Sequence, residues 1–86
     1  MSENKADRKL KLIWDFKGPD AARTAEHHAI HLKEYIKNNK LSLQIAGSEE
    51  INPQHAIAYL VVQESQMPPV RDALKPHRGQ LFSEEI

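Results

Sequence analysis

Three histidines within five residues form the densest group of chemically versatile side chains in this chain. On a helix, His27 and His31 lie one turn apart, and Glu34 follows on the same flank three positions later. Two imidazoles and one carboxylate make up the ligand set of many mononuclear iron sites, and two histidines four positions apart on a helix can chelate zinc. The candidate metal ligands are therefore His27, His31 and Glu34.

The context of these histidines also allows a plainer interpretation. No glutamate follows the first histidine, as one does in the zinc-protease helix. Three ligands on one exposed helix have no wall to exclude water, so a working site needs a further ligand from His55, Asp15 or a second copy of the chain. Without one, the histidines form a solvated helix face. We accordingly expect no cofactor.

A second candidate polar site consists of His28, Tyr35 and Asp15. His28 falls at the edge of the apolar stripe of its helix, where a hydrogen bond to backbone or to a tyrosine hydroxyl is expected. Asp15 stands near the end of the first predicted strand, on the outward side of its alternation. General acid–base chemistry would require these groups to line a pocket.

The histidines lie on a well-delimited helix. Gly18, Pro19 and Asp20 precede it, and proline at a first helical position with an acidic residue beside it is typical of a helix start. Over 21–39 an apolar stripe rich in alanine recurs with helical periodicity, at Ala21, Ala25, Ala29, Leu32 and Ile36. The asparagines and lysines of 37–40 end the helix, with an asparagine suited to a left-handed cap.

Other elements follow from period-two patterns and from breakers. Strict alternation over 9–16 predicts a strand with Leu10, Leu12, Trp14 and Phe16 on one face. Further strands are predicted at 41–45 and 56–63, a loop at 47–54, a helix at 70–75, and a brief edge strand at 81–82. The order β-α-β-β-α(-β) resembles the ferredoxin-like plait, an antiparallel sheet with two helices on one face. That resemblance concerns the fold alone and implies no activity.

Composition narrows the functional classes. The 86 residues suffice for one domain at 9–86, after a flexible polar leader at 1–8. Twelve basic and twelve acidic residues cancel, which argues against nucleic-acid and anionic-membrane partners. There is no cysteine, no apolar run of the roughly 20 residues that a membrane span needs, and no secretory signal pattern. We expect a cytoplasmic protein.

The third predicted strand is apolar on both sides, which is unexpected for a sheet with one open face. This pattern would leave an apolar surface on the open face, made by Ile13, Ile57, Tyr59 and Val61. A homodimer packing sheet on sheet or pairing edges would cover it, and so would a larger protein partner or a tail folded back with Leu81 and Phe82 as a plug. RNA recognition is disfavoured, because only Tyr59 could stack.

The sequence thus predicts a small non-catalytic interaction or ligand-binding module that homodimerises through its open sheet face. The alternative is a small enzyme or metal-dependent protein with its site on the histidine-rich helix.

Overall fold

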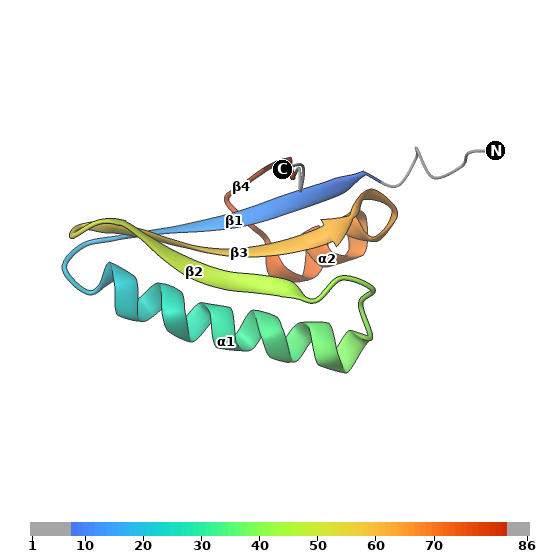
Figure 1. Cartoon of the computed structure of the whole chain (residues 1–86), viewed down its shortest axis with the longest axis horizontal. Helices are drawn as coiled ribbons and strands as arrows, with labels where there is room; N and C mark the ends of the chain where they lie inside the picture. The colour runs from blue at the N-terminus through green and yellow to red at the C-terminus, as the bar shows by residue number, and fades with distance from the viewer. Residues whose placement is uncertain (1–7, 83–86) are drawn as a thin grey trace.

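One four-stranded antiparallel sheet and two helices build this α+β protein (Figure 1). The computed structural model describes residues 8–82. In chain order the elements are β1 (Lys9–Lys17), α1 (Ala21–Asn39), β2 (Ile45–Asn52), β3 (His55–Gln63), the 3₁₀ turn η2 (Glu64–Gln66), α2 (Met67–Leu74) and β4 (Arg78–Leu81). The strand order across the sheet is β2-β3-β1-β4. The predicted α+β class is confirmed.

Most of the predicted leader, residues 1–7, lies outside the described part of the chain. Its last residue, Arg8, is held at the start of β1. The Arg8 guanidinium donates to the Glu64 carboxylate at 3.2 and 3.3 Å, and the Arg8 carbonyl accepts a 2.7 Å hydrogen bond from the Glu64 amide.

Helix α1 begins and ends where the sequence predicts. Gly18 has a φ of 109°, a conformation open to glycine, and its amide donates to the Gln54 carbonyl at 2.8 Å. The helix is capped by Lys40 in the left-handed region, with φ 52°. The prediction that an asparagine takes this position is therefore wrong by one residue, since Asn39 is still helical.

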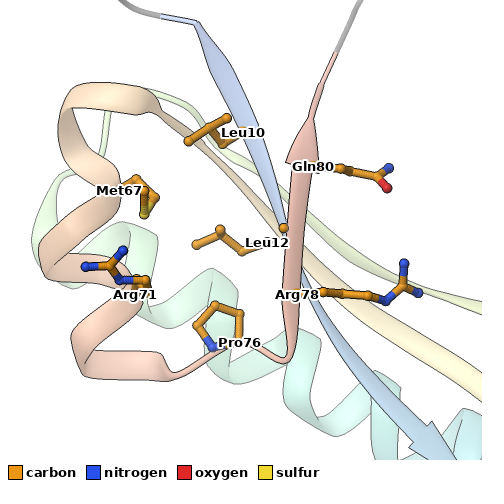
Figure 2. Close-up of a pocket in the computed structure, with 8 residues that line it drawn as sticks. Leu10, Leu12, Met67, Arg71, Pro76, Arg78 and Gln80 are labelled. Atoms are coloured by element: carbon orange, nitrogen blue, oxygen red, sulfur yellow. The ribbon is translucent and has the colours of Figure 1, made fainter.

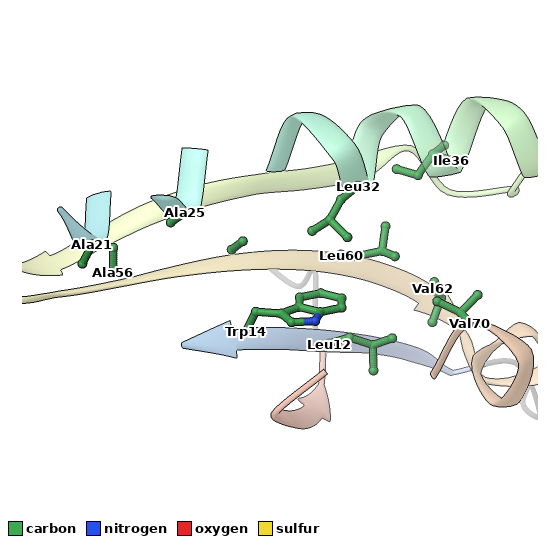
Figure 3. Packing of buried hydrophobic residues seen from close by; sticks show 11 residues of the cluster. Leu12, Trp14, Ala21, Ala25, Leu32, Ile36, Ala56, Leu60, Val62 and Val70 are labelled. Atoms are coloured by element: carbon green, nitrogen blue, oxygen red, sulfur yellow. The ribbon is translucent and has the colours of Figure 1, made fainter. Parts of the chain in front are cut away.

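The core lies between the helices and one face of the sheet (Figure 3). Leu12 and Trp14 from β1 meet Leu60 and Val62 from β3, and the predicted alanine-rich stripe of α1 closes the layer. Its small side chains let the first half of α1 approach β3 closely, where Ala21 faces Ala56. Val70 of α2 joins the same cluster, so both helices cover the same sheet face.

The second strand differs from the prediction. Residues 41–44 connect α1 to β2, and the Leu41 amide donates to the Ile36 carbonyl at 3.1 Å as part of the helix end. The predicted loop at 47–54 instead contains most of β2 and the tight turn into β3, with a bulge between Glu50 and Asn52. β2 is an edge strand, and an edge strand can carry the polar, charged sequence that resembles a loop.

The last two elements also extend beyond their predicted ranges. Helix α2 starts at Met67, because Pro68 and Pro69 are accommodated in its first turn. Strand β4 forms at Arg78–Leu81 rather than at 81–82, and it pairs with residues 10–13 of β1. Within residues 8–82, no helix is both long and apolar enough to cross a membrane.

Candidate functional site

The open face of the sheet carries an ion cluster centred on Asp15, which joins three strands. Arg78 of β4 donates two hydrogen bonds to the Asp15 carboxylate, at 2.9 Å from Nε and 3.0 Å from Nη2. His55 of β3 contacts the same carboxylate from the other side, with its Nε2 at 2.9 Å from Oδ1. The Asp15 and His55 side chains are only 22% and 24% exposed, so this cluster is partly shielded from water.

These contacts keep Asp15 ionised. The hydrogen bonds from Arg78 first, and from His55 second, hold the pKa of the Asp15 carboxyl well below its usual range, while partial desolvation opposes them. A carboxylate fixed by a guanidinium on one side and an imidazole on the other is a rigid electrostatic centre. Its charge is already compensated, which suits a structural or recognition role.

A second histidine binds the backbone at the same point. The Asp15 amide donates to His77 Nδ1 at 2.9 Å, which requires that this nitrogen be unprotonated. The His77 ring also lies 6.4 Å from the Phe16 ring. Strand β4 pairs with β1 only as far as Ile13, so the His77 ring accepts the hydrogen bond from the Asp15 amide that a strand carbonyl would otherwise accept.

Next to the ion cluster, Tyr59 lies across the sheet face. Its ring covers Gly47 of β2, where a Cβ would come within 2.8 Å of the hydroxyl oxygen and 3.1 Å of Cζ. Lys11 of β1 places its Nζ 4.6 Å from the ring centroid. Gly47 thus makes room for the aromatic ring, and the lysine holds it through a cation–π contact.

The three aliphatic residues expected to be exposed on this face are buried within the single chain. The exposed fractions are 2% for Ile13, 5% for Ile57 and 0% for Val61. Strand register places Lys11 opposite Val61, and both Tyr59 and Arg78 opposite Ile13. Long polar side chains can cover apolar neighbours with their aliphatic or aromatic parts. The prediction of a bare apolar surface is wrong, whereas Tyr59 remains partly exposed.

Of the two tail residues offered as an alternative plug for the open face, Leu81 lies elsewhere. Leu81 is paired with Leu10 at the β1–β4 register, which places it on the helix side of the sheet, and it is 60% exposed. It does not cover Ile13 or Val61.

The candidate metal ligands on α1 do not form a closed site. His31 Nδ1 lies 3.7 Å from Glu34 Oε1, and these side chains are 74% and 64% exposed. Among residues 8–82, no three His, Asp or Glu side chains are arranged so that they could hold a metal ion. In the described chain His27, His31 and Glu34 therefore lie on a solvated helix face.

His28 points the other way, onto the core. Its ring centroid is 4.9 Å from that of Trp14 and 5.6 Å from that of Phe16. Its Nε2 is buried without a hydrogen-bond partner, so the expected bond to backbone or tyrosine is absent. Burial, and then the charges of His31 and His77, lower the pKa of His28.

The three residues of the second candidate polar site, His28, Tyr35 and Asp15, therefore do not lie together. His28 and Tyr35 adjoin the core on the helix side, while the Asp15 carboxylate lies on the open face. Trp14, the residue before Asp15 in β1, faces the helix side, and its indole N–H donates to the Leu74 carbonyl at 3.0 Å.

A groove of about 350 Å³ opens between α2 and the β1–β4 pair (Figure 2). Leu10, Leu12, Met67 and Pro76 give it a mainly apolar lining. The Arg78 side chain extends from β4 away from the groove in Figure 2, where it meets Asp15 on the open face. Arg71 of α2 also lines the groove, and its Nε lies 3.5 Å from the carboxylate of Asp72.

Sequence reasoning missed Arg78 and His77 as partners of Asp15. They lie 63 and 62 positions away, and β4 was expected to begin after both. The alternation of β1 does place Asp15 on the open face, but only the strand register brings its partners to it.

Comparison with protein families, with curated proteins and with solved structures finds no match for this chain.

Proposed function

We propose that this protein is a small non-catalytic interaction module of the ferredoxin-like plait class that self-associates through its open sheet face. The observation that carries the proposal is the ordered pair of Tyr59 and Arg78 side chains on that face. Tyr59 is fixed between Gly47 and Lys11, and Arg78 is fixed on Asp15. Tyrosine and arginine are enriched at protein interfaces and dominate their hot spots.

The plait assignment is supported by the order of the elements. The chain runs β-α-β-β-α-β, neighbouring strands are antiparallel, and the first and third strands are central in β2-β3-β1-β4. Both helices contribute to one core on one side of the sheet. This arrangement leaves the other face without a covering layer of secondary structure, which is where a partner can dock.

Preorganisation favours binding at this face. Side chains that are already held by hydrogen bonds and a cation–π contact lose little conformational entropy when a partner arrives. The apolar layer beneath them, formed by Ile13, Ile57 and Val61, is buried.

A second copy of the chain is a suitable partner because the face carries charges of both signs. Lys11 is positive and the exposed Glu49 is negative, while Arg78 and Asp15 already pair with each other within the chain. A two-fold axis through the face can oppose unlike charges, and such an isologous contact uses each residue twice.

Sedimentation equilibrium of the untagged protein tests this proposal. We expect a dimer that dissociates on dilution, and a Tyr59→Ser variant whose dissociation constant is about 30-fold larger or more. The matched control is Tyr35→Ser, a partly buried tyrosine that packs beside the core on the helix side, and it should leave the dimer unchanged. A wild-type protein that stays monomeric at about 1 mM, or a dimer indifferent to Tyr59→Ser, would overturn the proposal.

A metal-dependent role for α1 has less support, because His31 and Glu34 are exposed and only loosely paired. Zinc that remains bound in stoichiometric amount after dialysis, and is lost in the His27→Ala and His31→Ala variants, would favour that role instead.

A further inference from the structure

We infer that a basic hollow at the carboxyl end of α1 binds a small organic anion with an apolar body. This basic hollow, of about 770 Å³, is lined by Lys33, Ile36, Lys37, Lys40, Leu41 and Gln44. It is remote in sequence from the Asp15 cluster and does not depend on self-association. The ligand class follows from three features of its lining.

The first feature is the concentration of positive charge. Lys33, Lys37 and Lys40 all line the hollow, and no acidic residue does. None of the three lysines forms an ion pair with residues 8–82. Glu34, an acidic neighbour in sequence, is paired with His31 instead, at 3.7 Å.

The second feature is that helix electrostatics explain only part of this arrangement. Cations stabilise the last turn of a helix, which accounts for Lys37 and Lys40. Lys33 lies before the last turn, and like charges four positions apart on a helix repel each other. A bound anion would relieve the repulsion between Lys33 and Lys37.

The third feature is an apolar floor. Ile36 is 5% exposed and belongs to the core, and Leu41 packs against that core. Lysine stems add further aliphatic surface. A volume of this size lies within the range that accommodates small organic ligands. The lining therefore suits an anionic head group, phosphate or carboxylate, attached to a short apolar portion.

The experiment is an NMR titration of ¹⁵N-labelled protein with hexyl phosphate, hexanoate, inorganic phosphate and hexylamine. We expect hexyl phosphate or hexanoate to shift the amides of residues 33–44, with an affinity at least about 5-fold above that of inorganic phosphate because of the apolar floor. The stronger of the two organic anions identifies the head group. Hexylamine should leave these amides unchanged, and added salt should weaken the binding.

The deciding variant replaces all three lysines, Lys33→Gln, Lys37→Gln and Lys40→Gln. It should reduce the affinity by about 10-fold or more, since each exposed charge contributes modestly. The matched control, Lys17→Gln, Arg23→Gln and Lys75→Gln, removes the same charge elsewhere and should change the affinity by less than about 2-fold.

Three results would overturn the inference. One is equal weakening in the two triple variants, which would indicate a nonspecific charge effect. Another is shifts that are not confined to residues 33–44. The third is binding to phosphatidylglycerol vesicles without binding of either organic anion, which would assign the hollow to a membrane surface.

Discussion

Replacing Gly47 with alanine is a small change that should weaken self-association while sparing the fold. A Cβ at this position would stand 2.8 Å from the Tyr59 hydroxyl oxygen and 3.1 Å from Cζ, well inside the roughly 3.5–4.0 Å of ordinary carbon contacts. The Tyr59 ring end must move, because the crowded atoms are the far end of a side chain. The backbone at Gly47 has no positive φ, so it accepts alanine. The ring would then also leave its position beneath Lys11.

The expected effect on the folded monomer is small because two contributions oppose each other. Loss of an exposed cation–π contact costs about 0.5–1 kcal/mol. Glycine to alanine at a backbone conformation that alanine tolerates stabilises by about 0.4–1 kcal/mol through the unfolded chain. The free energy of unfolding should therefore stay within about 1 kcal/mol of the wild-type value.

Self-association should respond more strongly, because a two-fold interface contains the displaced tyrosine twice. If moving Tyr59 costs about 1 kcal/mol of binding per copy, the dimer loses about 2 kcal/mol, which is about 30-fold in the dissociation constant. The magnitude rests on Tyr59 acting as an anchor of the interface.

Sedimentation equilibrium gives the dissociation constant, and urea unfolding gives the monomer stability. The matched control is Gly79→Ala on the helix side of β4, where a Cβ would meet Leu12 Cδ2 at an ordinary 3.4 Å. We expect no change in its dissociation constant. If aromatic NMR shifts show that Gly47→Ala has displaced Tyr59 while the dissociation constant is unaltered, Tyr59 is not an anchor of the interface.

Two further predictions concern the titrating groups. Burial lowers the pKa of His28, so the unfolded chain binds this proton more readily than the folded protein. The free energy of unfolding should therefore fall as the pH drops below about 6.5. In the His28→Leu variant, the free energy of unfolding measured in urea should depend less on pH between about pH 7 and 5. An unaltered pH profile in that variant would remove His28 as the cause. The pKa of Asp15 is also lowered, and this group acts at more acidic pH. The ionised Asp15 carboxylate stabilises the folded protein above about pH 4, and this stabilisation is lost as the pH falls further. Asp15→Asn should therefore lower the thermal midpoint at neutral pH, and the difference from wild type should shrink on acidification; a constant difference down to about pH 2 would contradict this assignment.

The strongly patterned elements could be predicted from the sequence. β1 shows strict alternation and β3 a continuous apolar run, and α1 has both a periodic stripe and clear breakers at each end. β2 was missed because an edge strand needs only one hydrogen-bonded neighbour and tolerates Gly47, Ser48 and two glutamates. Its position is determined by pairing with β3, which is a tertiary effect.

The open face shows a second limit of sequence reasoning. The alternation correctly places Ile13 and Ile57 on that face, but their burial depends on where the long side chains of neighbouring strands lie. Likewise, the contact between Asp15 and His55 joins residues 40 positions apart through the β1–β3 register. The histidine-rich part of α1, the strongest chemical signal in the sequence, proved to be mainly solvated apart from His28.

We propose that two copies of the chain meet across the open sheet face. An isotope-filtered NOE experiment on a mixture of labelled and unlabelled protein at about 1 mM tests it directly. We predict intermolecular contacts from the Tyr59 ring to open-face side chains of the other copy, such as Lys11 and Arg78. Intermolecular contacts confined to the helix side, for example to the exposed Ile30, or no intermolecular contacts at all, would contradict the claim.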